Sequence, residues 1–171
     1  MSVVACRIYD KKICLASDSQ LTNGDVKMPT MEFPKLYTIG DNVVGIVGNC
    51  DEVILLLNFI KRKDLPQSKL KLQLYLSKFY KWRNGISEKT ETDSKTSPSN
   101  IIFIMVSNKK KVFLADGLFV VRVKKYIAIG SGSEIALGAL AAGVDVKKAV
   151  EITCAYNTLC GLPVVYTEVP I

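Results

Sequence analysis

Side chains able to do chemistry are limited in this sequence by the complete absence of histidine. Without histidine there is no Ser-His-Asp triad, no Cys-His pair and no histidine-containing zinc site. The five cysteines are odd in number, scattered and mostly set in apolar runs: Cys6, Cys14, Cys50, Cys154 and Cys160. That pattern is unlike a disulfide framework or a CxxC metal site and indicates reduced thiols. Any catalysis must therefore use a base other than histidine.

The formal net charge of +7 raises the question of a nucleic-acid partner. The lysines, however, are spread over residues 61–81, 109–111 and 124–125, without the regularly interleaved aromatic residues of a single-strand binder. We interpret them as solvated faces and expect no nucleic-acid partner.

Targeting and membrane signals are weak throughout the chain. The apolar run Val53–Ile60 is interrupted by Asn58 and is far shorter than a bilayer span. The N-terminal segment reaches Arg7 and Asp10 without the basic, apolar and small-residue regions of an export signal. We expect a cytoplasmic protein without membrane association, folded as one domain over residues 1–171.

Two hairpins are predicted in the first third of the chain. The strand-like runs Ser2–Ile8 and Lys12–Asp18 flank a polar turn. The runs Lys35–Ile39 and Val43–Val47 flank Gly40-Asp41-Asn42, whose residues tolerate positive φ.

Helical spacing of apolar residues predicts two pairs of helices. The first pair covers Asp51–Lys63 and Ser68–Trp82. In the second pair, an Ala-rich helix over Ser133–Gly143 is followed by a helix that Asp145 caps.

Four strand-like runs separate the two helix pairs and are predicted to form a meander: Ile101–Ser107, Lys111–Ala115, Phe119–Val123 and Tyr126–Ile129. The polar segment Ser87–Asn100 before them is predicted to be an exposed, mobile loop, and Pro163–Val169 a last strand. This order suits an α+β fold with two stacked antiparallel sheets covered by helices on both sides.

Several short segments follow one another in a distinctive order. In the N-terminal half they are Ser2-Val3-Val4-Ala5-Cys6-Arg7, Leu15-Ala16-Ser17-Asp18-Ser19, Pro34-Lys35-Leu36-Tyr37 and Gly45-Ile46-Val47-Gly48. In the C-terminal half they are Ala128-Ile129-Gly130-Ser131-Gly132-Ser133, Ala136-Leu137-Gly138-Ala139, Val146-Lys147-Lys148-Ala149-Val150 and Cys160-Gly161-Leu162-Pro163-Val164. In order and spacing they resemble the proteasome β-subunit and HslV peptidase family of N-terminal-nucleophile (Ntn) hydrolases, especially its short bacterial and phage members. The resemblance covers nearly the whole chain except Ser87–Asn100.

The resemblance implies a four-layer αββα sandwich and a homo-oligomeric ring, hexameric or heptameric and able to stack, that encloses the active sites. It also implies a polypeptide substrate and leaves room for an ATPase unfoldase as partner. The nucleophile would be the Ser2 hydroxyl, exposed by removal of Met1, and the base would be the Ser2 α-amino group. Lys35 would be the ammonium beside the nucleophile, with Asp18 as its carboxylate partner. An α-amino group titrates at about 7.7–8.0, so a nearby ammonium needs to lower its pKa only slightly.

Further roles follow from the same resemblance. The backbone N–H of Gly48 or Asn49 would stabilise the oxyanion. Ser131 would hydrogen-bond near the terminal amine, or cap the helix that follows it, and the two roles are compatible.

Three positions depart from the family's pattern. Asn49 stands where a second glycine is usual, Asn157 where an acidic residue supports the amine, and Cys160 where serine is frequent. No cofactor is required, but backbone carbonyls of the loop Asn157–Pro163, including that of Cys160, would be able to hold a sodium ion as in HslV-type subunits.

Three functions stay open at this point. The first is a threonine-peptidase-like hydrolase that uses serine. The second is a non-catalytic ring or scaffold subunit with Met1 retained, which the changes at Asn49 and Asn157 favour. The third is another Ntn hydrolase acting on a small amide. A monomeric or dimeric state would favour this function.

Overall fold

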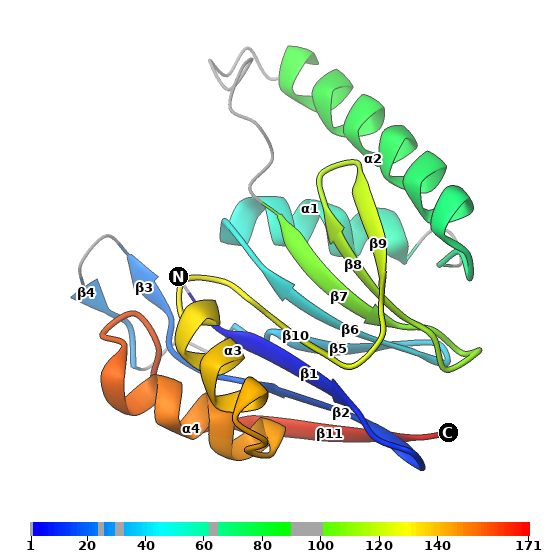
Figure 1. The fold of residues 1–171 in the computed structure, drawn as a ribbon. Helices are drawn as coiled ribbons and strands as arrows, with labels where there is room; N and C mark the ends of the chain where they lie inside the picture. Colours follow the sequence, from blue (N-terminus) through cyan, green and yellow to red (C-terminus); the bar gives the residue numbers. More distant parts are fainter. Residues whose placement is uncertain (1, 24–25, 30–32, 62–64, 90–100) are drawn as a thin grey trace.

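The computed structural model describes residues 2–23, 26–29, 33–61, 65–89 and 101–171. Met1 and residues 90–100 of the predicted loop lie outside this part of the chain. The described residues form four layers, helices, sheet, sheet and helices, as Figure 1 shows. The predicted α+β class and αββα sandwich are confirmed.

The first sheet has the strand order β10-β1-β2-β11. Its strands are β1 (Val4–Ile8), β2 (Lys12–Ser17), β10 (Tyr126–Ile129) and β11 (Val165–Pro170). All pairs are antiparallel, and the predicted hairpin of β1 and β2 pairs Ala5 with Ala16.

The second sheet has the order β5-β6-β7-β8-β9. Its strands are β5 (Leu36–Ile39), β6 (Asn42–Val47), β7 (Ile102–Val106), β8 (Val112–Asp116) and β9 (Phe119–Val123). The β5–β6 hairpin turns at Gly40, whose φ of 56° lies in the region that glycine tolerates. A separate short hairpin joins β3 (Thr22–Asn23) and β4 (Val26–Lys27), in a stretch for which no strands were predicted.

The predicted four-strand meander is wrong in its last strand. β7, β8 and β9 form a meander, but β10 crosses to the other sheet and pairs with β1. The Lys124-Lys125 turn gives no local sign of this, because the pairing depends on apolar partners on β1, distant in sequence.

The helices lie on the outer faces of the two sheets (Figure 1). They are α1 (Cys50–Ile60), α2 (Lys69–Lys89), α3 (Ser133–Ala141) and α4 (Val146–Tyr156). The first pair packs on the five-stranded sheet and the second on the four-stranded sheet. α2 continues through Lys89, so the predicted loop at Ser87–Asn100 was wrong for its first three residues; Glu88 and Lys89 are good helix formers and need no apolar contact. None of the described helices is long and apolar enough to cross a membrane.

The central strand β1 is apolar on both faces because each face meets a different layer. Val4 and Cys6 pack between the sheets, whereas Val3 and Ala5 pack against the α3 and α4 layer. A Cβ atom added at Gly45 on β6 would lie 2.5 Å from Val4 Cγ1. The two sheets therefore approach closely beside the start of β1, where Ser2 is placed.

Candidate active site

Asp18, directly after β2, is the best-connected polar side chain near the N-terminus. It is 1% exposed, and its Oδ1 accepts a hydrogen bond from the Val3 backbone N–H at 2.9 Å. Its Oδ2 accepts from the backbone N–H groups of Gln20 at 3.1 Å and Gly161 at 3.2 Å. A buried carboxylate that accepts this many hydrogen bonds is held in one position. Asp18 thus joins the residue after Ser2, the chain after β2 and the loop after α4.

Lys35 supplies the positive charge that matches Asp18. Its Nζ lies 3.0 Å from Asp18 Oδ1, and the side chains are 6% and 0% exposed. It also donates to the backbone carbonyls of Asp18 at 3.1 Å and Gln20 at 2.8 Å. An ammonium has three hydrogens to donate, so these three acceptors orient it fully. The predicted pairing of Asp18 with Lys35 is present in the structure.

The turn after β10 closes over the backbone of Ser2. The Ser2 backbone nitrogen donates to Ser131 Oγ at 3.0 Å, and the Ser2 carbonyl accepts from Ser131 Oγ at 3.3 Å and from the Gly132 N–H at 3.2 Å. Gly130 has a φ of 95°, and a Cβ atom there would lie 2.2 Å from the Ser2 carbonyl oxygen. Only glycine permits this approach. Ser131 makes no side-chain cap for α3, so of its two predicted roles the contact with Ser2 is the one present.

Asn157 lies behind Ser131, at the end of α4. Its Nδ2 donates to the Ser131 carbonyl at 3.1 Å, and its Oδ1 accepts from the Leu159 N–H at 2.9 Å. A carboxylate could not make the first of these bonds. Asn157 therefore supports the Ser131 turn through its amide.

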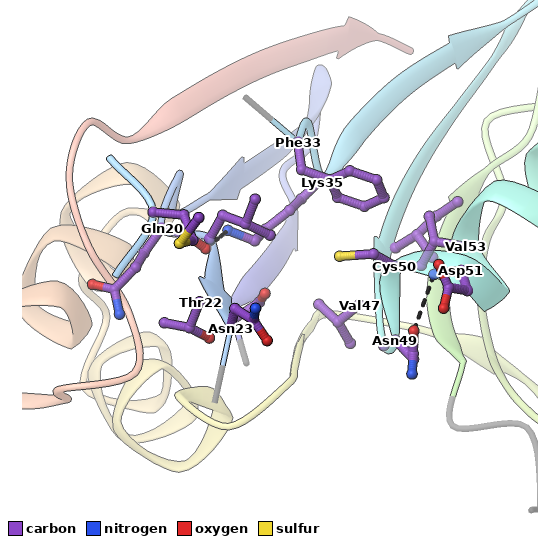
Figure 2. A pocket seen from close by; sticks show the side chains of 15 residues that line it. Gln20, Thr22, Asn23, Phe33, Lys35, Val47, Asn49, Cys50, Asp51 and Val53 are labelled. Carbon is purple, nitrogen blue, oxygen red and sulfur yellow. Dashed lines mark hydrogen bonds between the residues drawn. The ribbon is translucent and has the colours of Figure 1, made fainter. Parts of the chain in front are cut away.

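A cavity of about 530 Å³ is lined by Ser2 and by residues between Gln20, after β2, and Val53, in the first turn of α1. Figure 2 shows Gln20, Thr22 and Asn23 on one side and Val47, Asn49 and Asp51 on the other. Gly48, with a φ of 148°, and Asn49, the N-cap of α1, both line it. The predicted oxyanion donors therefore share one cavity with Ser2 and Lys35.

Three cysteines of the described structure, Cys6, Cys154 and Cys160, are not activated. Burial raises the pKa of the Cys160 thiol to about 12, with the Asp18 carboxylate adding to the rise. Burial likewise raises the pKa of Cys154 to about 11 and that of Cys6 well above its usual value. Cys6, Cys14 and Cys160 are buried, and none of the five forms a disulfide. The thiols of Cys6, Cys154 and Cys160 are therefore poor nucleophiles.

Two of the carbonyls predicted to hold sodium already accept hydrogen bonds. That of Asn157 accepts from the Cys160 N–H at 3.1 Å, and that of Pro163 accepts from Ser19 Oγ at 2.6 Å. Each of these two carbonyl oxygens has a second lone pair that could bind a cation, so sodium binding stays a prediction.

Two contributions to the site were missed by the sequence analysis. Gln20 offers its backbone carbonyl to Lys35, and its side chain donates to the Thr158 carbonyl at 3.0 Å. A backbone contact of this kind leaves no side-chain signal. Asp51 was predicted only as a helix residue and Cys50 only as a reduced thiol, although their place at the start of α1, after the Gly48 strand end, puts both in the cavity wall.

No family model matches the sequence, and no curated protein matches it significantly. Solved structures match over the full length. A structure described as Thiobacillus denitrificans BPH in complex with epoxomicin aligns with a TM-score of 0.80 and 22% identity, covering 98% of each chain. BPH alone gives 0.79 and 22%, covering 98% of this chain and 97% of that one. Eukaryotic HslV from Trypanosoma brucei gives 0.70 and 19%, covering 99% of each. The chain therefore has the proteasome-like Ntn-hydrolase fold.

Proposed function

We propose that this chain is a proteasome-like peptidase subunit, in which Ser2 becomes the N-terminal nucleophile once Met1 has been removed. The observation that carries the proposal is that Ser2 and Lys35 line one open cavity, with Ser131 Oγ at 3.0 Å from the Ser2 nitrogen and with Lys35 paired to the buried Asp18. The buried pair is expensive to maintain, and stability alone gives little reason to keep it.

The first step joins Ser2 to the substrate. The Ser2 hydroxyl oxygen attacks the peptide carbonyl carbon while its proton passes to the neutral α-amine. The amine then gives this proton to the departing amine of the substrate, the C–N bond breaks and an ester remains on Ser2. Water, activated by the same α-amine, hydrolyses the ester and restores the hydroxyl.

Lys35 and Asp18 set the conditions for this proton transfer. The fixed ammonium favours the neutral form of a nearby amine, so more of the base is available at neutral pH. Asp18 Oδ1 binds both Lys35 Nζ and the Val3 N–H, which ties the position of the ammonium to the chain that carries the amine. Ser131 Oγ, already 3.0 Å from the Ser2 nitrogen, would hydrogen-bond to the freed amine.

Backbone donors at the end of β6 would stabilise the charge that develops on the substrate carbonyl. Gly48 has no side chain to obstruct an approaching peptide, and both it and Asn49 line the cavity with Ser2. An oxyanion donor of this type contributes about 10²–10³-fold to the rate.

A ring assembly and a polypeptide substrate complete the proposal. The fold similarity to HslV and BPH supports this part of the proposal. Of these two proteins, BPH is described in complex with epoxomicin. We include a homo-oligomeric ring, hexameric or heptameric, with an ATPase unfoldase as its optional partner, and a cytoplasmic location.

Activity is expected to depend on the removal of Met1. The protein would be purified twice, from untreated cells and from cells in which methionine aminopeptidase is inhibited, and each product identified by intact mass. Only the product that lacks Met1 should hydrolyse fluorogenic peptides, because an α-nitrogen held in an amide bond cannot act as a base. Equal hydrolysis by the product that retains Met1 would contradict the proposal. No hydrolysis by either product would favour the non-catalytic ring subunit.

A further inference from the structure

The cavity beside Ser2 has apolar inner walls and a polar mouth. Phe33, Ile46 and Val53 line it, and Ile46 and Val53 are each 2% exposed. Its volume of about 530 Å³ falls within the range of roughly 300–1,000 Å³ found for small-molecule sites. A long side chain with an apolar stem can therefore enter it.

Among the described residues, two with charged side chains line this cavity, and they are not equivalent. Lys35 is 6% exposed, and its hydrogens are directed to Asp18 and to two backbone carbonyls, so it offers little charge to a ligand. Asp51 is exposed, and no ion pair joins it to another residue of the described chain. The charge presented to an entering side chain is therefore negative.

The next acidic residue, Glu52, differs from Asp51 in its contacts and in its position relative to the cavity. Glu52, the other acidic residue in the first turn of α1, is bound by Arg83, whose Nε lies 2.8 Å from its Oε1. Glu52 does not line the cavity, whereas Asp51 does. Asp51 also favours the start of α1 through the helix dipole, but that role does not require a place in the cavity wall.

We infer that Asp51 determines specificity: it favours lysine or arginine over glutamate or aspartate in the substrate residue whose carbonyl Ser2 attacks. The apolar stem of such a side chain would pack on Phe33 and Val53 while its charged end reaches Asp51. This inference rests on the proposed function.

Peptide hydrolysis gives the first test. Three fluorogenic peptides that differ only in arginine, leucine or glutamate before the scissile bond would be compared at 0.15 M salt, where the Debye length of about 8 Å limits steering by the net charge of +7. We expect arginine to give the highest kcat/KM and glutamate the lowest. Asp51→Asn should reduce the arginine-to-glutamate ratio by about 10-fold, and Asp51→Lys should invert it.

Asp10→Asn is the matched control, because Asp10 is exposed in the β1–β2 turn, outside the cavity lining. It removes the same charge and should leave the ratio unchanged. A role confined to the helix dipole would lower the melting temperature of Asp51→Asn and leave the ratio as it was, which would overturn the inference.

Cys50 provides a second test that needs no hydrolysis. Its side chain points into the cavity, next to Asp51 (Figure 2). Methanethiosulfonates convert a thiolate to a mixed disulfide with loss of sulfinate, and reagents that carry trimethylammonium or sulfonate groups would be compared by peptide mapping at Cys50. The cationic-to-anionic rate ratio should fall at least about 3-fold in Asp51→Asn and stay unchanged in Asp10→Asn.

The two tests separate two kinds of failure. If the wild-type protein cleaves none of the peptides, the proposed function fails, while a labelling ratio that depends on Asp51 still supports the negative cavity. If the protein is active but neither ratio depends on Asp51, the inference is overturned and the proposed function stands.

Discussion

Ser2→Ala is expected to abolish peptide hydrolysis, with a loss of at least about 10³-fold in kcat. The substitution removes the hydroxyl oxygen that forms the ester, and Cys160 cannot replace it because that thiol is buried, with its pKa raised to about 12. Initial rates with a fluorogenic peptide, measured on protein whose intact mass shows loss of Met1, would give the size of the effect.

Ser2→Thr is the matched control for this loss. It keeps a hydroxyl and an α-amine at the same position, so it should hydrolyse the peptide at a measurable rate. Both variants should melt close to the wild type, because the backbone contacts of Ser2 with Ser131 and Gly132 are retained. Hydrolysis by Ser2→Ala at the wild-type rate would place the nucleophile elsewhere.

Lys35→Met should both destabilise the protein and abolish its activity. The substitution leaves the Asp18 carboxylate buried without its counter-ion, and breaking a buried pair in this way costs about 3–5 kcal/mol. It also removes the ammonium that favours a neutral α-amine at Ser2. Urea unfolding would give the free energy, and hydrolysis under conditions where the variant remains folded would give the activity.

Lys124→Met makes the same change at an exposed lysine in the turn before β10. Its free energy of unfolding should differ from the wild type by no more than about 0.5 kcal/mol, with activity retained. If Lys35→Met were as stable and active as this control, the ion pair would be neither structural nor catalytic.

Local patterns predicted most of the secondary structure because the spacing of apolar residues within a segment differs between helices and strands. The apolar positions Leu72, Tyr75, Leu76 and Phe79 of α2 are all buried, and the Asp145 side chain caps α4 by accepting from the Lys148 N–H. The assignment of β10 to the wrong sheet shows the limit. A strand's own pattern does not identify its partner, and Tyr126–Ile129 pairs with β1, which is more than a hundred residues earlier.

The candidate site was less accessible to such reasoning. A strand-end aspartate and a single lysine are usually solvated, and only the family resemblance singled out Asp18 and Lys35. The structure brings Lys35 Nζ to 3.0 Å from Asp18 Oδ1, with 6% of the Lys35 side chain and 0% of the Asp18 side chain exposed. The Gln20 carbonyl and the cavity position of Asp51 depend on how loops meet in space, which no spacing in the sequence encodes.

Epoxomicin provides the most direct measurement of the central claim, that Ser2 is an N-terminal nucleophile. An epoxyketone has two electrophilic carbons, one for a hydroxyl and one for an adjacent free amine. Intact mass and peptide mapping should find one inhibitor per chain, attached to Ser2 in protein that lacks Met1, and none on Ser2→Ala or on protein that retains Met1. Absence of the adduct from processed wild-type protein, or its presence at any other residue, would contradict the claim.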